Sequence, residues 1–574
     1  ITRSIGRRQG CPDALGAQAE TKHKAMTTQG DAVKLADIGD FFLIAVARVP
    51  MLRAPRAAQR RPELMATALP SHRSPLLDGE VGTLWRRANR ELVLCYPNTY
   101  RVAGASLGLQ VVYRALNARE TVSCQRAVLA NDAFESRVAQ PQRSLEYGMA
   151  LADFDTILFS IAYELDVPHV PWMLQQGGVG PLSDERGRRA PLVIAGGPLT
   201  QSNVLPLAPF VDAVVMGEAE SALPQLLDVL EATDDKATRL VLLSEVPGVW
   251  VPSLHGDAVP NVLVARGSHI PAVGQWRSPN AEFSDMALLE TSRGCPRYCR
   301  FCVVRAPASP MRAPELSAVL AALDLPLYAD APRIGLVGAA VSDWEPVKAA
   351  IAAIVARGKG VGISSLRADR LDDEFVGLLA AGGYRTLTVA SDAASQRLRG
   401  KMMKGLRTRH FIAAAQLARA HRLRSLKLYV ILGLPDEHDA DIDELLELCR
   451  TLRNELPLTI TMSPFVPKLH TPLADAPFEP ASSQQRKLER VRKALGRDKI
   501  EVRFDPPKWA WVEYRLSQGG RESGLAAWAA LNAGGAFAAY KAAFAAIDGQ
   551  APLEEHAAAR AAREHGLWPV EGAR

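Results

Sequence analysis

With 574 residues, the chain is long enough for about three or four domains. Its 48% hydrophobic and 23% charged residues are typical of globular proteins. The net charge of +6 arises in residues 1–90, where 15 Lys and Arg stand against 8 Asp and Glu, so there is no strong signal for a nucleic-acid partner. No hydrophobic run reaches the roughly 18–20 residues that span a bilayer. The odd number of seven cysteines argues against a disulfide framework. We therefore expect a cytoplasmic protein without a membrane partner.

Residues 1–80 differ in composition from the rest of the chain. Arg, Ala, Pro and Gln are scattered through them without sustained periodicity. Such a segment buries too little hydrophobic surface to offset the entropy of folding. We expect a disordered leader, or translation from upstream of the native start, with Met51 and Met65 as candidate starts.

Residues 88–232 alternate hydrophobic runs with amphipathic segments. Strands are expected at 91–96, 155–160, 191–195 and 211–216, and helices at 106–116, 170–176 and through residue 230. This alternation predicts a parallel, doubly wound, Rossmann-like sheet, whose ligands bind at the carboxyl ends of the strands. Two glycine turns, Gly196-Gly197-Pro198 and Gly217-Glu218, follow strands at that edge.

Three cysteines, Cys295, Cys299 and Cys302, form the pattern C-x3-C-x2-C directly after the hydrophobic run 286–290. Thiolates hold iron–sulfur clusters, and three of them leave one iron of a four-iron cluster open for another ligand. A zinc knuckle needs a fourth ligand, and no Cys or His stands at knuckle spacing.

This pattern, with the aromatic Phe301 before the last cysteine, resembles the radical S-adenosylmethionine (SAM) signature C-x3-C-x-φ-C. The resemblance implies a [4Fe-4S] cluster on the three cysteines, whose open iron binds SAM. Reductive cleavage of SAM then yields a 5'-deoxyadenosyl radical. It also implies an external electron donor such as flavodoxin or ferredoxin, and Phe301 would pack beside the adenine.

Residues 284–475 are expected to form the core of this family, a partial (β/α)6 TIM-like barrel. Strands are expected at 286–290, 333–341, 360–365, 385–390, 425–432 and 458–463, and helices at 314–323, 345–357, 373–381, 408–421 and 440–454. Residues 233–283 are interpreted as a linker with short strands. Residues 476–574 are interpreted as a helical C-terminal region, with its Ala-rich end on the surface.

Barrel chemistry occurs at the carboxyl ends of the strands, so the candidate residues are expected there. The expected cofactor contacts in the barrel are Gly338, Ala339, Ser364, Ser365, Arg367 and Gly433. The expected catalytic residues are Asp392, Lys468 and His470. Asp392 stands where relatives carry Glu, and the stretch 465–472 resembles the F-V-P-K-x-H-T-P segment of the family.

The first domain carries a second resemblance. Its motifs Y-P-N-T-Y (96–100), G-G-P (196–198) and M-G-E-A-E (216–220) resemble the N-terminal domain of cobalamin-type radical SAM proteins. This implies a corrinoid tail at the strand ends, beside Gly196, Gly197, Gly217 and Glu218. The D-x-H-x-x-G loop that supplies a cobalt ligand is absent, so bound cobalamin would lack that histidine. The alternative is a degenerate domain without a corrinoid.

The sequence therefore predicts a radical SAM enzyme, with cobalamin-dependent methyl transfer as an extension and with no substrate identified. An RNA methylthiotransferase is one alternative, but it needs three further cysteines before the barrel, where only Cys95 and Cys124 stand. A non-catalytic iron–sulfur electron-transfer or scaffold protein is the other.

Overall fold

The structure, a computed structural model, describes residues 72–129, 140–265, 267–305, 309–364 and 366–548. Its strands form three sheets, in which every neighbouring pair is parallel except one pair at an edge. The predicted α/β class with parallel sheets is confirmed. The candidate Ser365 and most of the expected leader lie outside the described residues.

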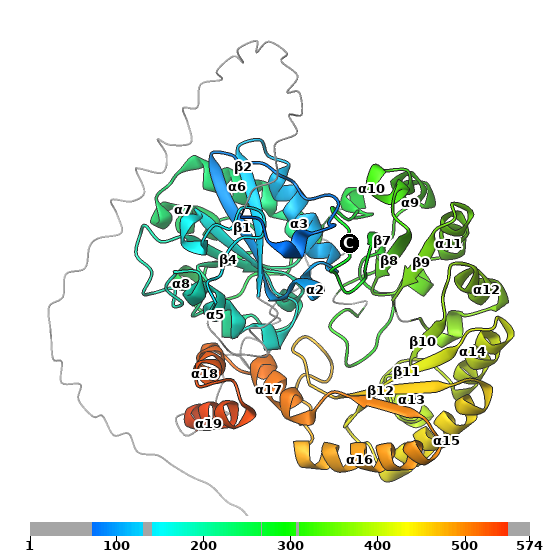
Figure 1. Cartoon of the computed structure of the whole chain (residues 1–574). Helices are drawn as coiled ribbons and strands as arrows, with labels where there is room; N and C mark the ends of the chain where they lie inside the picture. The colour runs from blue at the N-terminus through cyan, green and yellow to red at the C-terminus, as the bar shows by residue number, and fades with distance from the viewer. Residues whose placement is uncertain (1–71, 130–139, 266, 306–308, 365, 549–574) are drawn as a thin grey trace, which may run out of the picture. The chain divides into compact units, whose positions relative to one another are not determined.

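The first sheet has the strand order β2-β1-β3-β4-β5-β6. Figure 1 labels β1, β2 and β4 of this sheet. Its strands are β1 (Arg90–Thr99), β2 (Val122–Leu129), β3 (Thr156–Ser160), β4 (Leu192–Gly196), β5 (Ala213–Val215) and β6 (Val249–Trp250). Both faces of the sheet are buried, because Val93 and Cys95 of β1 enter one hydrophobic core while Leu92 and Leu94 enter the other. Burial on both faces explains why these strands are nearly continuous hydrophobic runs.

Helices from two distant parts of the chain cover this sheet. The core that contains Leu92 includes α3 (Leu107–Asn117), α6 (Leu223–Ala232) and α7 (Lys236–Ser244), and the short helices nearby are α2 (Tyr100–Ala103) and α8 (Pro252–His255). The core that contains Val93 includes α5 (His169–Gln176), α17 (Pro507–Gln518), α18 (Arg521–Asn532) and α19 (Phe537–Asp548).

The three C-terminal helices therefore pack on the first sheet, and the alanines of α19 remain partly or fully exposed, as expected for a helix on the surface. Leu516, Ala527 and Phe544 are completely buried in the core that these helices share with β1. Small side chains allow the close approach, since a Cβ added at Gly524 would lie only 1.9 Å from the carbonyl oxygen of Pro206.

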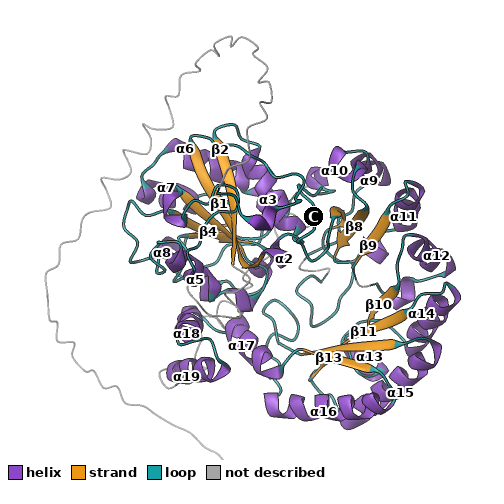
Figure 2. Ribbon diagram, in the orientation of Figure 1, coloured by secondary structure: helices purple, strands orange, loops and turns teal. Residues whose placement is uncertain are grey.

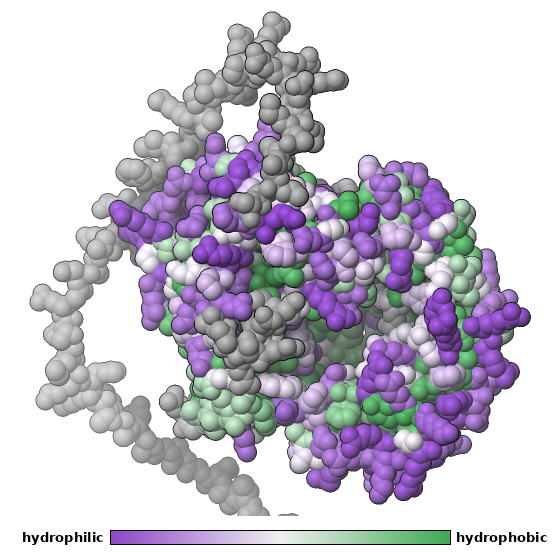
Figure 3. All heavy atoms as spheres, viewed as in Figure 1, coloured by the Kyte–Doolittle hydropathy of each residue, from purple (hydrophilic) through white to green (hydrophobic). Residues whose placement is uncertain are grey.

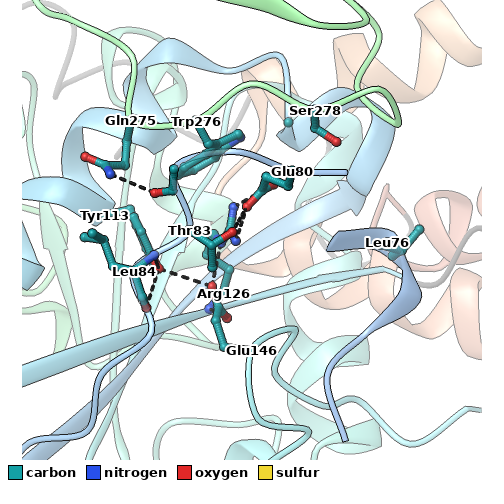
Figure 4. Close-up of polar contacts among 12 residues, drawn as sticks. Leu76, Glu80, Thr83, Leu84, Tyr113, Arg126, Glu146, Gln275, Trp276 and Ser278 are labelled. Atoms are coloured by element: carbon teal, nitrogen blue, oxygen red, sulfur yellow. Dashed lines mark hydrogen bonds and ion pairs between the residues drawn. The ribbon is translucent and has the colours of Figure 1, made fainter. Parts of the chain in front are cut away.

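The segment before β1 is anchored by a buried arginine. The guanidinium of Arg126 in β2 lies 2.6 Å from the carboxylate of Glu80 and 2.7 Å from that of Glu146 (Figure 4). It also lies over the rings of Tyr113 and Trp276, 4.9 and 4.3 Å from their centroids. The folded chain thus includes Glu80, so the expected end of the leader at residue 80 and start of the domain at residue 88 are too late.

Residues 233–283, which we expected to be a linker, are also largely folded. Helix α7 is capped by the side chain of Asp235, which accepts a hydrogen bond from the amide of Thr238 at 2.9 Å. Strand β6 pairs antiparallel with β5, and Trp276 is buried. The short strand β6 is of the kind expected in this region, whereas helix α7 was not expected.

The other two sheets have the strand orders β7-β8-β9 and β10-β11-β12-β13, and a parallel bridge between Leu366 and Val389 joins them. Their strands are β7 (Met286–Ser292), β8 (Arg333–Gly338), β9 (Gly360–Ile363), β10 (Thr386–Ala390), β11 (Ser425–Leu432), β12 (Leu458–Pro464) and β13 (Glu501–Phe504). The sequence predicted all but β13, which lies in the region expected to be helical.

Helices flank one side of these strands (Figure 2). They are α9 (Leu316–Leu323), α10 (Pro326–Ala329), α11 (Val347–Ala356), α12 (Asp373–Ala381), α13 (Gln396–Lys401), α14 (Thr408–Ala420), α15 (Asp439–Glu455) and α16 (Ala481–Arg497). In α16 the buried residues Gln484, Leu488, Val491 and Leu495 form one stripe, and the outer surface near α15 and α16 is mainly hydrophilic (Figure 3). Among the described residues, no helix is both long and hydrophobic enough to cross a membrane.

Candidate functional site

The three cysteines lie on the loop that leaves β7, as the sequence predicted. Two backbone hydrogen bonds of 2.8 Å, exchanged between Arg293 and Arg312, close the neck of this loop. Cys299 is buried, and Cys295 and Cys302 are partly buried. The strand end and the closed neck therefore hold three thiols on one short segment.

The neck of the loop is tightly packed. The amide of Cys295 donates to the carbonyl of Ser309 at 2.9 Å. Gly294 has a φ of +75°, and a Cβ added to it would lie 2.3 Å from the carbonyl oxygen of Pro310. Only glycine fits this backbone without strain.

The three thiols are of the donor type that holds iron–sulfur clusters. Burial raises the pKa of each of the three, to about 11 for Cys302, so cluster assembly would release protons. In the described part of the chain, no three His, Cys, Asp or Glu side chains lie close enough together to hold one metal ion. A four-iron cluster offers each cysteine a different iron, so its ligands need not converge on one point. The donor set therefore fits a [4Fe-4S] cluster.

Charged residues surround the cysteine loop. Asp392 has a φ of +55° and forms an ion pair with Lys404, and both charges act on the pKa of Cys299. The guanidinium of Arg367 lies 3.0 Å from the carboxylate of Asp369 and donates to the carbonyl of Lys404 at 3.0 Å. The candidates Asp392 and Arg367 thus lie near the loop, but their charges are already paired within the chain.

The ends of β7, β8 and β9 bring other candidates together. The hydroxyl of Ser364 lies 3.4 Å from the carbonyl oxygen of Gly338. A Cβ added to Gly338 would lie 2.4 Å from the hydroxyl of Ser292, so glycine is needed for this close approach. Ala339 follows on an exposed turn, and the partly buried Phe301 packs against the core of the second and third sheets.

Gly433, by contrast, lies in a turn that the chain itself fills. Its φ is +80°, and its amide donates to Glu437 at 3.0 Å. A Cβ added to it would lie 2.8 Å from Glu479, and Lys487 lies 2.8 Å from both glutamates. These contacts explain the glycine without a cofactor, and no contact in the described residues supports the expected cofactor role.

Lys468, on the loop after β12, lies in a second charged cluster. Its ammonium lies 2.7 Å from the carboxylate of Glu164 and 2.5 Å from that of Glu513. The hydroxyl of Tyr163 donates to the same Glu513. His470 lies two residues further along the loop, with a φ of +63°. Asp392 and Lys468, both expected to be catalytic, are thus engaged in different ion pairs.

A cavity of about 320 Å³ opens at the carboxyl ends of the first sheet. It is mostly hydrophobic and lies between the ends of β1, β3, β4 and β5 and the start of α3. It also reaches Glu290 of β7 and Val337 of β8. The four residues expected to contact a corrinoid tail all line it: Gly196, Gly197, Gly217 and Glu218.

The lining of this cavity contains no histidine among the described residues. His169 lines a separate cavity beside Trp172 and Trp509, and burial lowers the pKa of its imidazole to about 4. His169, whose spacing from Asp166 does not match the D-x-H-x-x-G pattern, is therefore not part of the first cavity.

Glu218 does not point a free carboxylate into the cavity. It accepts hydrogen bonds from Arg312, from Arg293 at 3.1 Å and from the amide of Ala265 at 2.6 Å. Burial raises the pKa of Glu218, but the two arginines outweigh this effect and leave it below its ordinary value. Its role as a direct cofactor ligand is therefore not supported by its contacts.

Two family models match this chain. One, described as "Radical SAM proteins, N-terminal", covers residues 108–252, and the other, "Radical SAM superfamily", covers residues 289–449 and includes all three cysteines. The chain belongs to the radical SAM superfamily.

Relatives of this radical SAM protein include an uncharacterized protein of Methanocaldococcus jannaschii, MJ0966, which is 29% identical over 62% of this chain and 76% of its own length. Among solved structures, TsrM from Kitasatospora setae, a radical SAM methyltransferase with cobalamin and a [4Fe-4S] cluster bound, is 16% identical, with 67% of this chain and 77% of that one covered and a TM-score of 0.47. The cobalamin-dependent SAM radical enzyme OxsB with aqua-cobalamin bound is 15% identical, with 63% and 52% covered and a TM-score of 0.44.

Several residues of this radical SAM protein's candidate site were missed from the sequence. They are Lys404, which pairs with Asp392; Glu164 and Glu513, which pair with Lys468; and Arg293 and Arg312, which pair with Glu218. Arg293 stands inside the T-S-R-G-C segment and could have been noted there. The other four belong to no recognisable pattern.

Proposed function

We propose that this chain is a radical SAM enzyme that holds a [4Fe-4S] cluster on Cys295, Cys299 and Cys302. The observation that carries the proposal is the placement of these three cysteines, and of no fourth, on a loop with a closed neck at the end of β7, within the matched radical SAM region. When bound, such a cluster supplies one electron that breaks a carbon–sulfur bond of SAM and gives methionine and a 5'-deoxyadenosyl radical. An external one-electron donor, such as flavodoxin or ferredoxin, must provide that electron.

In this proposal the chain's own residues bind and position SAM beside the loop. Gly338 and Ala339 expose backbone at the end of β8, and Ser364 adds a hydroxyl beside Gly338. Phe301 supplies a hydrophobic surface for the adenine. Asp392, through its ion pair with Lys404, places charge close to Cys299.

We further propose that the cavity at the first sheet binds the tail of a cobalamin, which would allow methyl transfer. Its volume of about 320 Å³ falls within the usual range for ligand pockets. Its hydrophobic walls and glycine turns suit a planar, mostly hydrophobic group. Because no described histidine lines the cavity, binding would depend on contacts to the tail and the corrin ring.

The geometry gives less support to an RNA methylthiotransferase. Cys95 and Cys124, the cysteines in the described chain before the barrel, are at most 1% exposed and face opposite cores of the first sheet. Neither is placed to join a second cluster.

The test is anaerobic reconstitution of the full chain with iron, sulfide and hydroxocobalamin, followed by gel filtration and analysis of iron, corrinoid and 5'-deoxyadenosine. The proposal expects about four irons per chain, as a single four-iron cluster requires, together with SAM cleavage after reduction. Iron without SAM cleavage would favour an electron-transfer or scaffold protein instead. Retained iron without corrinoid would remove methyl transfer through cobalt but leave the radical SAM assignment intact.

A further inference from the structure

One carboxylate connects the wall of the cavity to the neck of the cysteine loop. Glu218 lies directly after Gly217 in the turn that follows β5, and both residues line the cavity. Its side chain forms ion pairs with Arg293 and Arg312, the two residues whose backbones close the neck. In sequence, Glu218 is 75 residues from Arg293 and 94 from Arg312.

The two arginines depend on Glu218 to different degrees. Arg293 has two other carboxylate partners, Glu290 at 2.8 Å and Glu220 at 2.9 Å. Within the described chain, Arg312 has Glu218 as its carboxylate partner and otherwise donates to the carbonyl of Ala265 at 2.7 Å. Loss of the Glu218 charge would therefore leave Arg293 paired and Arg312 without a counter-charge.

These ion pairs are shielded from solvent. The side chains of Glu218, Arg293 and Arg312 are 11%, 16% and 20% exposed. Charge-assisted hydrogen bonds of this kind are stronger than neutral ones and fix geometry more tightly. Ion pairs on the surface, by comparison, contribute little.

We infer that Glu218 is a positioning residue that ties the neck of the cysteine loop to the wall of the cavity and thereby keeps the three cysteines in the arrangement that retains the cluster. Its carboxylate accepts four hydrogen bonds from three residues, which leaves it little capacity to bind a ligand directly. A ligand that displaces the turn at Gly217 would also displace the neck of the cysteine loop, because Glu218 connects the two. The inference rests on the proposed cluster.

The test uses the full chain, reconstituted anaerobically with iron and sulfide. The variants are Glu218→Gln, Arg312→Gln and the double variant. The matched control is Arg119→Gln, which removes an arginine that forms ion pairs with Asp228 and Glu231 of α6. The measurements are the rate at which ferrozine removes iron, the electron paramagnetic resonance spectrum of the reduced protein, and the melting temperature. If wild type takes up no iron, the proposed function itself fails, whatever the variants do.

We expect each single variant to lose iron at least about tenfold faster than wild type, which corresponds to about 1.4 kcal/mol. The double variant should lose iron as fast as Glu218→Gln, because that single variant already removes both ion pairs of Glu218. Its melting temperature should exceed that of Glu218→Gln, because Arg312 is no longer present without a counter-charge. The inference is overturned if Glu218→Gln loses iron at the wild-type rate. It is also overturned if the double variant regains wild-type iron retention, because the unpaired charge of Arg312 would then explain the loss in Glu218→Gln.

Discussion

The ammonium of Lys468 lies 2.7 Å from the carboxylate of Glu164, although Lys468 follows β12 and Glu164 follows β3 of a different sheet. Glu513 of α17 lies 2.5 Å from the same ammonium. Burial lowers the pKa of Lys468, but the two carboxylates outweigh this effect and leave the pKa above its ordinary value. Lys468 is therefore charged at neutral pH, which suits an ion pair and argues against the general base that a catalytic lysine would provide.

Lys468→Met should destabilise the protein. It leaves two carboxylates close together without a cation, and loss of one partner of a buried ion pair costs about 3–5 kcal/mol. Anaerobic denaturant unfolding of the reconstituted protein measures this. The double variant Lys468→Met/Glu513→Gln should regain part of the loss, because one of the remaining charges is gone. A Lys468→Met protein of wild-type stability that has lost turnover would instead support a catalytic role.

The folded chain should require residues before β1. A protein that starts at Met65 keeps Glu80 and should load iron and melt like the full chain. One that starts at Leu84 leaves the buried Arg126 with Glu146 alone, and should lose about 3–5 kcal/mol of stability. The melting temperatures of the two proteins test this, and equal values would contradict the role of Glu80.

The stability of the protein should depend on the protonation of Asp166. Burial raises the pKa of its carboxyl from 3.8 to about 7, against the opposing hydrogen bond from Asn98. A raised pKa means that the folded state prefers the protonated acid, so its contribution to stability is present below about pH 4 and is lost as pH rises to 7.

Asp166→Asn keeps the size of the side chain and removes the titration. As pH rises from 4 to 7, the free energy of unfolding of the variant should increase relative to that of wild type, by at most about 4 kcal/mol. Above pH 7 this difference should stay constant. Denaturant unfolding across this pH range is the measurement. Parallel curves for the variant and wild type would show that the carboxyl of Asp166 titrates normally.

The cavity is best tested at Gly108 of α3. This glycine lines the cavity, and a Cβ added to it meets no atom within 4 Å. Gly108→Leu should therefore fill the cavity without strain and reduce hydroxocobalamin retention at least about tenfold, or about 1.4 kcal/mol, with iron content unchanged. Gly496→Leu, in an exposed position of α16, is the control. Unchanged corrinoid retention in Gly108→Leu would place any corrinoid elsewhere.

Gly197 and Gly217, two of the expected corrinoid contacts, are poor positions for this test. Their φ angles are +103° and +89°, and added Cβ atoms would lie 2.7 Å from the backbone of Ile161 and 2.3 Å from that of Leu263. A substitution at either position would strain the chain itself, so loss of binding would not report on a ligand.

Strands with hydrophobic sequences were predictable, and β2 shows why others were not. All eight residues of β2 are buried, yet it contains Ser123, Gln125 and Arg126. Ser123 donates to the carbonyl of Arg86, the side-chain nitrogen of Gln125 donates to Glu91, and Arg126 donates to Glu80 and Glu146. A polar sequence can occupy a core when its partners come from elsewhere in the chain, and those partners are not visible in the strand's own pattern.

The same limit applies to the candidate site. The three cysteines were predictable because they stand within eight positions of one another. The partner of Lys468 in α17 is 45 residues away, and Arg293 and Glu218 are 75 residues apart. Only the packing of the three sheets and the C-terminal helices brings these side chains together.

The most direct test of the radical SAM assignment is the amount of 5'-deoxyadenosine formed when anaerobically reconstituted, reduced protein is mixed with SAM. Wild type should form it. Cys295→Ala, Cys299→Ala and Cys302→Ala should each form none and should fail to hold a full cluster, while Cys124→Ala, whose thiol is buried in β2, should match wild type in both. A wild-type level of 5'-deoxyadenosine in any one of the three cysteine variants, or none in wild type with a full complement of iron, would contradict the assignment.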